Sequence, residues 1–333
     1  MAKRALSTLS KVVVTARPFD STVKLLRAAA QEVVVNDQSD PFTPTELQTH
    51  LADADACLAF MTDKVDASLL SSAPKLKLIA CALKGFDNFD IEACSSRGVA
   101  VTAVPDLLTA PTAELAIALT LGLGRKVMRG DQLIRRGNFE GWRPKLYGLG
   151  LAGSTVGFLG FGAVGQATAA RLTGFEVAQM LYVDPRDDLT LSSNAVRVSG
   201  VDELLRMSDI VVCCAPLNPS THHILNASRL TRAKRGLLLV NISRGSCVDE
   251  EAVAHALDNG ILGGYAADVF EFEDWSIDGR PLAVNARLLA NANTILTPHL
   301  GSAVSDVREQ IEHAAASEIV RFANGEPLSY RVN

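Results

Sequence analysis

The 333-residue sequence lacks three features that would assign it to whole classes of protein. It has no apolar run approaching the ~20 residues that a membrane-spanning helix needs. It has no basic surplus, because 32 Lys and Arg stand against 37 Asp and Glu for a net charge of −5, and this argues against nucleic-acid binding. It has no C-x-x-C pair among its six cysteines, so we expect neither a zinc site nor a disulfide framework and assign no metal ligands.

The rest of the composition is typical of a globular protein. Hydrophobic residues make up 48% of the chain and charged residues 21%, which excludes a disordered protein. Lys3 and Arg4 are followed by scattered apolar residues and not by the continuous apolar region of a secretory signal. We therefore expect a cytoplasmic protein, and at about 100–200 residues per domain its length predicts two domains.

Short apolar runs alternate with helical patterns in the first 105 residues. Strands are predicted at 11–16, 32–35, 56–61, 76–83 and 99–104, with helices between them at 22–30 and 45–54. Buried runs separated by helices predict a parallel sheet that is covered on both faces. This block is expected to form a small, flavodoxin-like α/β domain.

A long helical pattern from Pro111 to about Arg136 leads into a second block. Six further strands are predicted at 154–159, 176–183, 210–215, 237–242, 265–269 and 294–296. Six strands with such crossovers are typical of a doubly wound (Rossmann) nucleotide-binding domain. The last helix, 304–324, has no strand after it and is predicted to pack on the first block. The sequence thus predicts an α/β protein with a substrate domain, 1–106 and 303–333, and a nucleotide domain, 107–302.

A G-x-G-x-x-G motif lies directly between a predicted strand and a predicted helix. Its expected cofactor contacts are Gly160, Gly162, Ala163, Val164 and Gly165. The glycines permit a tight turn, a close approach to a pyrophosphate and close packing of the helix on the strand. Asp184 ends the next predicted strand about 20 residues later, which is the spacing expected of a ribose-binding acid.

Asp184 also predicts which dinucleotide is bound. Its carboxylate would accept hydrogen bonds from ribose hydroxyls and repel a 2′-phosphate, so NAD is predicted over NADP. Arg186 tempers this prediction, since a nearby arginine can accommodate the phosphate. The alternative is a glycine-rich turn without a ligand, in which Asp184 is an ordinary residue before Pro185.

Ionisable side chains follow three strands of the second block. Arg244 follows one, Glu271 and Glu273 follow another, and His299 follows a third. Open α/β sheets hold their ligands at this end of the strands. An arginine can bind an anion, a histidine can exchange a proton near neutral pH, and a carboxylate can fix the imidazole tautomer. Each of these residues could alone be structural or solvated, but their joint placement favours a site.

Four segments together resemble the NAD-dependent D-2-hydroxyacid dehydrogenase superfamily over essentially the whole chain. They are the glycine motif, S-R-G-S-x-V-D-E, A-A-D-V-F-E and T-P-H-L-G-S. The resemblance implies that Arg244, Glu273 and His299 are catalytic. Glu273 matches the family position by its spacing from Asp268, whereas Glu271 does not. Further cofactor contacts implied in this way are Ala215, Pro216, Ile242, Ser243, Arg244, Asp268 and His299.

A narrower resemblance is to the phosphonate (phosphite) dehydrogenases. The segments that carry it are 81–90, 104–109, 140–148, 263–275 and 299–308. It implies that Lys84, with Arg244 and Arg308, makes a cationic pocket for a small, multiply charged oxyanion. Without the flanking match, Lys84 would be interpreted as a solvated loop lysine. The stretch 176–188 departs from the pattern, with an apparent extra residue and Asp184 where glutamate is expected, so dinucleotide preference stays open.

The predicted function is oxidation of phosphite to phosphate with transfer of hydride to NAD. In this mechanism Lys84 and Arg244 hold phosphite, and His299, held by Glu273, is the base for the attacking water, although Arg244 is not excluded as the base. The alternative is a D-2-hydroxyacid dehydrogenase that reduces a small 2-keto acid. More distant is an NAD(H)-sensing, corepressor-like binding protein. The family suggests a homodimer, and no nucleic-acid or membrane partner is expected.

Overall fold

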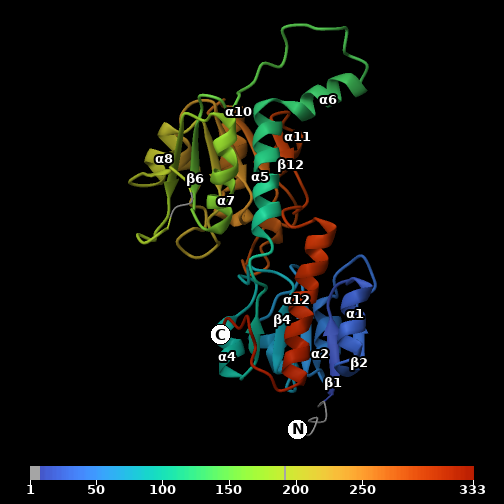
Figure 1. The fold of residues 1–333 in the computed structure, drawn as a ribbon. Coiled ribbons are helices and arrows are strands. Elements are labelled where there is room, and N and C mark those ends of the chain that lie inside the picture. The colour runs from blue at the N-terminus through green and yellow to red at the C-terminus, as the bar shows by residue number, and fades with distance from the viewer. Residues whose placement is uncertain (1–7, 191–192) are drawn as a thin grey trace. The chain divides into compact units, whose positions relative to one another are not determined.

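The computed structural model describes residues 8–190 and 193–333, which form two compact units (Figure 1). The smaller unit comprises the chain up to Leu108, Trp275–Asp278 and Val304–Asn333. The larger unit comprises Thr109–Asp274 and Gly279–Ala303. The predicted domain limits lie within two residues of these boundaries, except that Trp275–Asp278 was expected in the nucleotide domain.

The smaller unit contains a five-stranded parallel sheet in the order β2-β1-β3-β4-β5, as in flavodoxin-like folds. Its strands are β1 (Leu9–Val14), β2 (Ala30–Val35), β3 (Ala56–Ala59), β4 (Leu78–Cys81) and β5 (Ala100–Thr102). Its helices are α1 (Asp20–Arg27), α2 (Pro44–Leu51), α3 (Ala67–Ser72), α4 (Ile91–Ser96) and α12 (Ser305–Ala323). The predicted start of α2 is confirmed by a capping box, in which Thr43 and Glu46 bond each other's backbone N–H.

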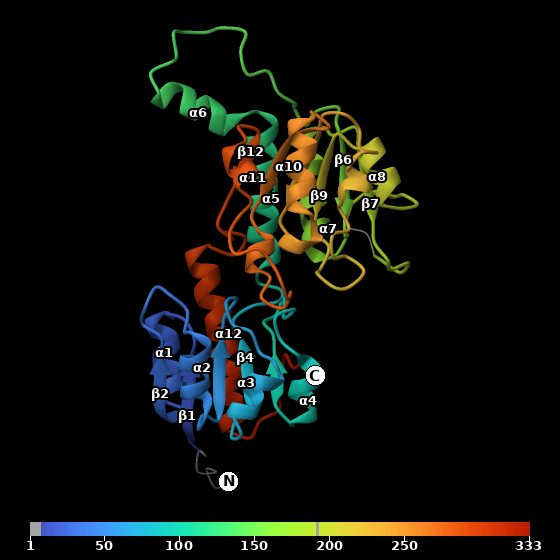
Figure 2. The same ribbon diagram turned by 180° about the vertical axis from the view of Figure 1, so that it is seen from behind.

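Helix α12 covers one face of the smaller sheet together with α1, while α2, α3 and α4 cover the other (Figures 1 and 2). It buries Ile311, Ala315 and Ile319 against the strands, as its predicted return to the first block requires. Its buried Glu312 also accepts a hydrogen bond from the backbone N–H of Phe19, the N-cap of α1, at 2.8 Å. The last helix therefore supplies the cap that the first helix lacks.

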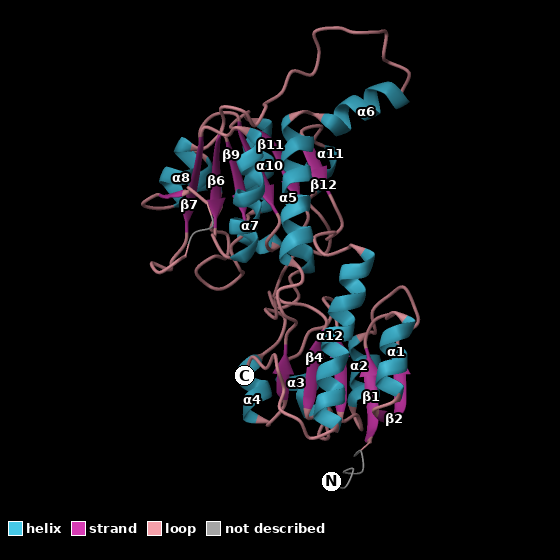
Figure 3. Cartoon of the chain, viewed as in Figure 1, coloured by secondary structure: helices cyan, strands magenta, loops and turns pink. Residues whose placement is uncertain are grey.

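The larger unit contains a seven-stranded parallel sheet in the order β12-β11-β10-β9-β6-β7-β8, with helices on both faces (Figure 3). Its strands are β6 (Thr155–Leu159), β7 (Gln179–Val183), β8 (Val196–Arg197), β9 (Ile210–Cys213), β10 (Leu237–Asn241), β11 (Leu262–Ala267) and β12 (Thr294–Leu296). Its helices are α5 (Thr109–Gly124), α6 (Val127–Arg135), α7 (Ala163–Leu172), α8 (Val201–Met207), α9 (Ala227–Leu230), α10 (Glu250–Asp258) and α11 (Ala286–Ala290), with 3-10 turns η1 (Thr173–Phe175), η2 (Gly245–Cys247) and η3 (Glu271–Glu273). The order of strands along the chain reverses between β6 and β9, as in a Rossmann fold. The predicted six strands are present, and the exposed two-residue β8 was missed because it carries no apolar run.

The single helix predicted from Pro111 to Arg136 is wrong, because α5 ends at Gly124. The carbonyl oxygen of Gly124 accepts a hydrogen bond from the N–H of Leu149, and Lys126 then adopts a left-handed conformation with φ 54° before α6 begins. A Cβ on Gly148 would lie 2.0 Å from that same oxygen, so the returning chain needs glycine there. Neither α5 nor any other helix in the described ranges is long and apolar enough to cross a membrane.

We predict that Glu312→Ala lowers the free energy of unfolding by about 2 kcal/mol, since it removes the cap of α1 and leaves the half-buried N–H of Phe19 without its partner. The matched control is Glu309→Ala on the same helix, whose carboxylate only accepts a bond from the exposed hydroxyl of Ser21. That change should cost no more than about 0.5 kcal/mol. Urea unfolding of both variants measures the difference, and equal losses would contradict the capping role.

Candidate functional site

The glycine motif joins β6 to α7 at the point where the strand order reverses. Gly160 has φ 86°, and a Cβ there would lie 2.7 Å from a backbone nitrogen of the loop after β9. A Cβ on Gly165 would lie 2.8 Å from the carbonyl oxygen of Gly160, so glycine is needed for α7 to pack this close. Gly162 is the N-cap of α7 and has no side chain to cap the first-turn N–H groups of Ala163 and Val164. This is the geometry that an anion such as a pyrophosphate requires.

Asp184 follows β7 and has hydrogen-bond partners on both carboxylate oxygens. One oxygen accepts from the N–H of Phe161, in the glycine motif, at 2.8 Å. Arg186 donates to the carboxylate from its backbone N–H at 3.0 Å and from its guanidinium at 2.8 and 2.9 Å. The guanidinium lowers the pKa of Asp184 to about 2, so the carboxylate is ionised throughout the physiological range. The structure thus places Asp184 beside the glycine motif as predicted and shows Arg186 paired with it.

The carboxylate of Asp268, at the end of β11, organises the loop that carries His299. It accepts hydrogen bonds from the hydroxyl of Thr297 at 2.6 Å and from the N–H groups of Leu300 and Gly301 at 2.7 and 2.8 Å. The N–H of His299 donates to the Asp268 carbonyl oxygen at 2.9 Å. Burial raises the pKa of Asp268, and these donors oppose that effect. The described contacts of Asp268 are therefore those of a positioning residue, and its cofactor contact stays a prediction.

His299 and Glu273 form the central pair of the site. Nδ1 of His299 lies 2.9 Å from Oε2 of Glu273, and both side chains are about a quarter exposed. The other oxygen of Glu273 accepts from the N–H of Phe270 at 2.8 Å, which fixes the carboxylate on η3. An ionised carboxylate accepts only, so Nδ1 carries the proton and Nε2 is the nitrogen that can exchange one.

Arg244 lies on the turn after β10, which packs directly against the segment that carries Glu273. The buried amide of Asn241 holds this turn by donating to the Arg244 carbonyl oxygen at 2.9 Å. A Cβ on Gly245 would lie 1.8 Å from the carbonyl carbon of Phe270, so only glycine allows this approach. The N–H of Ser246 donates to the buried carboxylate of Asp274 at 2.6 Å. The structure thereby links the arginine turn to the η3 turn.

The remaining predicted cofactor residues lie near these turns. Ala215 packs its backbone against Gly160, and exposed Pro216 follows it. Ile242 and Ser243 are buried at the end of β10, where the hydroxyl of Ser243 donates to the side-chain oxygen of Asn241 at 2.8 Å. All of these residues lie beyond the carboxyl ends of β9 and β10, but their contact with a cofactor stays a prediction.

Asn241, Gly245 and Asp274 shape the site without any role predicted for them from the sequence. Their roles depend on bonds to other segments, such as the one from Ser246 to Asp274. The local signals were an asparagine at the end of β10 and a glycine four residues later, because both residue types favour turns.

Lys84 and Arg308 both lie beside the carboxyl end of β4, in the smaller unit. Arg308, in the first turn of α12, donates from Nη1 to the carbonyl oxygen of Ala82 at 3.3 Å and lies over the ring of Phe60 at 6.0 Å. Burial lowers the pKa of Arg308. Lys84 forms an ion pair with Asp106, with both side chains about half exposed. Lys84 and Arg308 therefore both lie at the carboxyl end of β4, as predicted for two cations of one pocket. The carboxylate of Asp106 offsets part of the positive charge of Lys84.

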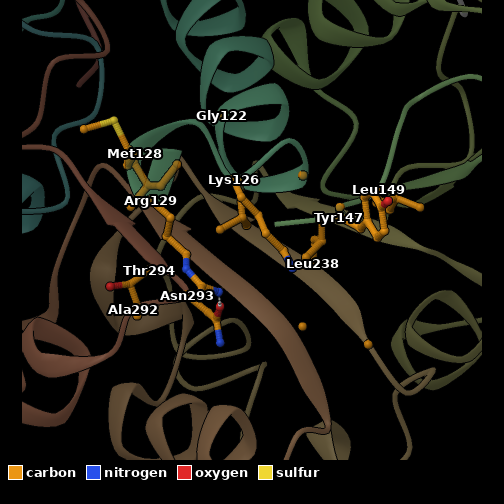
Figure 4. Close-up of a pocket in the computed structure, with 16 residues that line it drawn as sticks. Gly122, Lys126, Met128, Arg129, Tyr147, Leu149, Leu238, Ala292, Asn293 and Thr294 are labelled. Carbon is orange, nitrogen blue, oxygen red and sulfur yellow. Dashed lines mark hydrogen bonds between the residues drawn. The ribbon is translucent and has the colours of Figure 1, made fainter. Parts of the chain in front are cut away.

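A separate pocket, drawn in Figure 4, lies at the amino ends of β10–β12, beside the junction of α5 and α6. Arg129 bonds Asn293 across it at 3.0 Å, and Lys126 and Tyr147 also line it. It contains none of the predicted catalytic or cofactor residues, which lie at the opposite ends of these strands. Within residues 8–190 and 193–333, no cluster of three or more His, Cys, Asp or Glu could hold a metal ion.

A doubly wound parallel sheet with a glycine motif at its switch point, and a histidine–glutamate pair at adjacent strand ends, defines the class of nucleotide-dependent oxidoreductases. Residues 117–301 match the family model described as D-isomer specific 2-hydroxyacid dehydrogenase, NAD binding domain. The chain is 36% identical over 326 residues to a protein of Thermofilum pendens named glyoxylate reductase, covering 97% of this chain and 94% of that one.

Two solved structures extend the likeness to the whole fold. The TT0316 protein of Thermus thermophilus superposes with a TM-score of 0.85 at 34% identity, covering 97% of this chain and all of that one. An NADPH-dependent glyoxylate/hydroxypyruvate reductase of Sinorhizobium meliloti, in complex with NADP and malonate, gives 0.82 at 28% identity, covering 97% and 96%.

The chain belongs to the D-isomer specific 2-hydroxyacid dehydrogenase family. It is an oxidoreductase whose larger unit is the NAD-binding domain of that family, and the predicted fold class is confirmed. The curated relative is named glyoxylate reductase and not phosphite dehydrogenase, so it supports the broader resemblance and leaves the narrower one without support.

Proposed function

We propose that this protein oxidises phosphite to phosphate with NAD and that His299 handles the proton. The observation that carries the acid–base part is the 2.9 Å contact between His299 Nδ1 and Glu273 Oε2, which leaves Nε2 to exchange a proton. The proposal of phosphite, in place of a hydroxy acid, is supported by the cations Lys84 and Arg308 at the end of β4.

The residues present fit NAD. The Gly160 turn would admit a pyrophosphate where a Cβ would meet backbone, and the first turn of α7 is open to an anion. Asp184 offers a carboxylate beside the same motif. Bound there, NAD would supply the acceptor for a hydride. The family includes an NADPH-dependent relative, so NAD over NADP is our proposal, based on the negative charge of Asp184.

In the proposed reaction phosphite would lose the hydrogen of its P–H bond as hydride, for which NAD bound at the glycine motif would be the acceptor. The oxygen of a water forms the new bond to phosphorus, and one proton of this water passes to Nε2 of His299. Glu273 holds the imidazole in the tautomer that can accept it and stabilises the charge that follows. Arg244, on the turn after β10, would hold the oxyanion and stabilise negative charge at phosphorus, and a contact of Lys84 with the substrate stays a prediction. Arg244 is the alternative base.

A second candidate, reduction of glyoxylate or another small 2-keto acid, is favoured by the comparisons. The Thermofilum pendens relative is named for glyoxylate and covers nearly the whole chain. The same site serves this reaction in the opposite sense, because His299 would then donate its proton to the carbonyl oxygen that receives the hydride. Arg244 would bind the carboxylate.

We also propose that the protein is a homodimer. Helix α6 and the segment after it extend away from the rest of the larger unit in Figure 1. Four large apolar residues on them are 54–78% exposed: Ile134, Phe139, Trp142 and Tyr147. Large exposed apolar side chains gathered on one segment are typical of an interface.

The deciding experiment offers the purified protein phosphite with NAD, and glyoxylate with NADH, and follows absorbance of NADH. We expect NADH formation with phosphite, with one phosphate per turnover. In either direction His299→Ala should lower kcat by about 10²–10⁴-fold, the usual contribution of a positioned acid or base. Turnover of glyoxylate alone would replace the first candidate by the second, and silence with both would overturn both.

Lys84→Ala should raise the KM for phosphite about 10–100-fold and change kcat little, because a charge-assisted hydrogen bond contributes about 1.5–3 kcal/mol. The matched control is Lys64→Ala, an exposed lysine of the same unit that pairs with Asp278 at 3.8 Å. Steady-state kinetics at varied phosphite measure both. An unchanged KM in Lys84→Ala would remove Lys84 from the substrate site.

Asp184→Ala should narrow the preference for NAD over NADP, since it removes the charge that repels a 2′-phosphate and leaves Arg186. With a pKa of about 2, Asp184 is charged at all working pH values, so the preference of the unmodified enzyme should not vary between about pH 6 and 9. The control is Asp187→Ala, an exposed acid nearby that pairs with Arg197. The ratio of kcat/KM for the two dinucleotides is the measurement, and an equal ratio in all three proteins would refute the assignment.

A further inference from the structure

His223 and Glu271 form a second histidine–carboxylate pair, and its glutamate lies on the same short turn as the glutamate of the His299–Glu273 pair. Nε2 of His223 contacts Oε1 of Glu271, and Glu271 begins the η3 turn that ends at Glu273. Neither His223 nor Glu271 has a part in the proposed chemistry. The two pairs are therefore connected through a single turn of three residues.

Glu271 joins this turn to helix α10. Its N–H donates to Oε1 of Glu250 at 2.9 Å, and the N–H of Glu250 donates to its Oε2 at 3.4 Å. Burial and the charges of Glu271 and Asp274 raise the pKa of Glu250. Three carboxyl groups thus lie close together, and His223 is the side chain that bonds Glu271 in this group. Without it, the bonds to the Glu271 carboxylate from the described part of the chain would reduce to the long one from Glu250, while the repulsion of its acidic neighbours would remain.

His223 is also fixed to the turn that carries Arg244. Its N–H donates to the carbonyl oxygen of Ser246 at 2.7 Å, and its backbone is held in the left-handed region at φ 46°. The neighbouring His222 is exposed, and its ring stacks on that of His223 with 4.1 Å between the ring centres. His223 therefore connects the Arg244 turn to the turn that presents Glu273.

We propose that His223 is a positioning residue for the reaction: by holding Glu271 it fixes the η3 turn, so that Glu273 stays on Nδ1 of His299. This inference rests on the proposed function for its kinetic consequence. Its geometric consequence does not depend on the substrate, because it concerns the tautomer of His299. When the turn shifts, Glu273 withdraws from Nδ1, and the imidazole is free to place its proton on Nε2, the wrong nitrogen for a base.

The kinetic test compares three variants on whichever substrate the enzyme turns over. His223→Ala should lower kcat by roughly 10–100-fold, the size of effect seen when the partner of a functional residue is removed, with KM and NADH affinity within about twofold. His223→Gln, whose amide can donate to Glu271, should restore most of kcat. His222→Ala, the matched control in the same loop, should leave kcat within about twofold. A loss in His223→Ala that the Gln variant does not restore, or one accompanied by a fall in Tm and in NADH affinity, would overturn the proposal in favour of a general structural role.

The second test needs no substrate. Long-range ¹H–¹⁵N spectra of protein labelled at histidine report which ring nitrogen of His299 carries the proton, with assignment from His299→Ala and Glu273→Ala as the reference for a lost acceptor. The unmodified protein and His222→Ala should show the Nδ1–H tautomer, and His223→Ala should move toward the Glu273→Ala spectrum. An unchanged tautomer in His223→Ala would overturn the proposal. If neither phosphite nor glyoxylate is turned over, the proposed function fails, and this spectrum still decides the role of His223.

Discussion

The site depends first on one buried carboxylate, that of Asp268. Burying a charge is costly, and the raised pKa of Asp268 reflects that cost, which is offset by the hydroxyl of Thr297 and two backbone N–H groups. These bonds close the loop after β12 onto the end of β11 and hold His299 in a left-handed conformation, with φ 55°. A non-glycine residue rarely adopts that conformation, so the surrounding bonds must impose it. The imidazole therefore meets Glu273 because two adjacent strands end side by side and Asp268 ties their loops together.

The fold could be predicted from the sequence because its signals are local. Parallel strands buried on both faces are short apolar runs, and the helices between them have a different period, so the alternation identifies both sheets. The break between α5 and α6 could not be predicted, because it depends on a residue distant in the sequence. The N–H of Leu149 donates a hydrogen bond to the carbonyl oxygen of Gly124, where α5 ends. Strand β8 could not be predicted because two exposed residues have no hydrophobic pattern. The errors thus occur where a distant segment decides the local conformation, as after α5, or where exposed residues leave no hydrophobic pattern, as in β8.

The site was predictable to the extent that its residues end strands. Arg244, Glu273 and His299 could be selected because the carboxyl ends of parallel strands meet at one edge. The contact of Glu273 with His299 was implied by the family resemblance. The contact of His223 with Glu271 could not be predicted, because these two residues lie far apart in the sequence and neither belongs to a predicted motif role. The pairing of Lys84 with Asp106, and of Asp184 with Arg186, was equally hidden, although each changes the electrostatics of a predicted residue. Charge balance at a site is a property of the folded chain, and the sequence states only which charges exist.

The packing of α12, which also carries Glu312, on the smaller unit affects the order in which the two units fold during synthesis. The smaller unit begins with the first strands, but its face is completed by α12, whose Ile311, Ala315 and Ile319 belong to its core. During synthesis, one face of the smaller sheet therefore stays uncovered until the larger unit and then α12 have been synthesised. The described core residues of the larger unit include none from α12. Since domains generally fold as units as they emerge, the nucleotide-binding unit can complete its fold first. The interval before α12 emerges is the period in which the nascent chain is most exposed to aggregation and most dependent on chaperones.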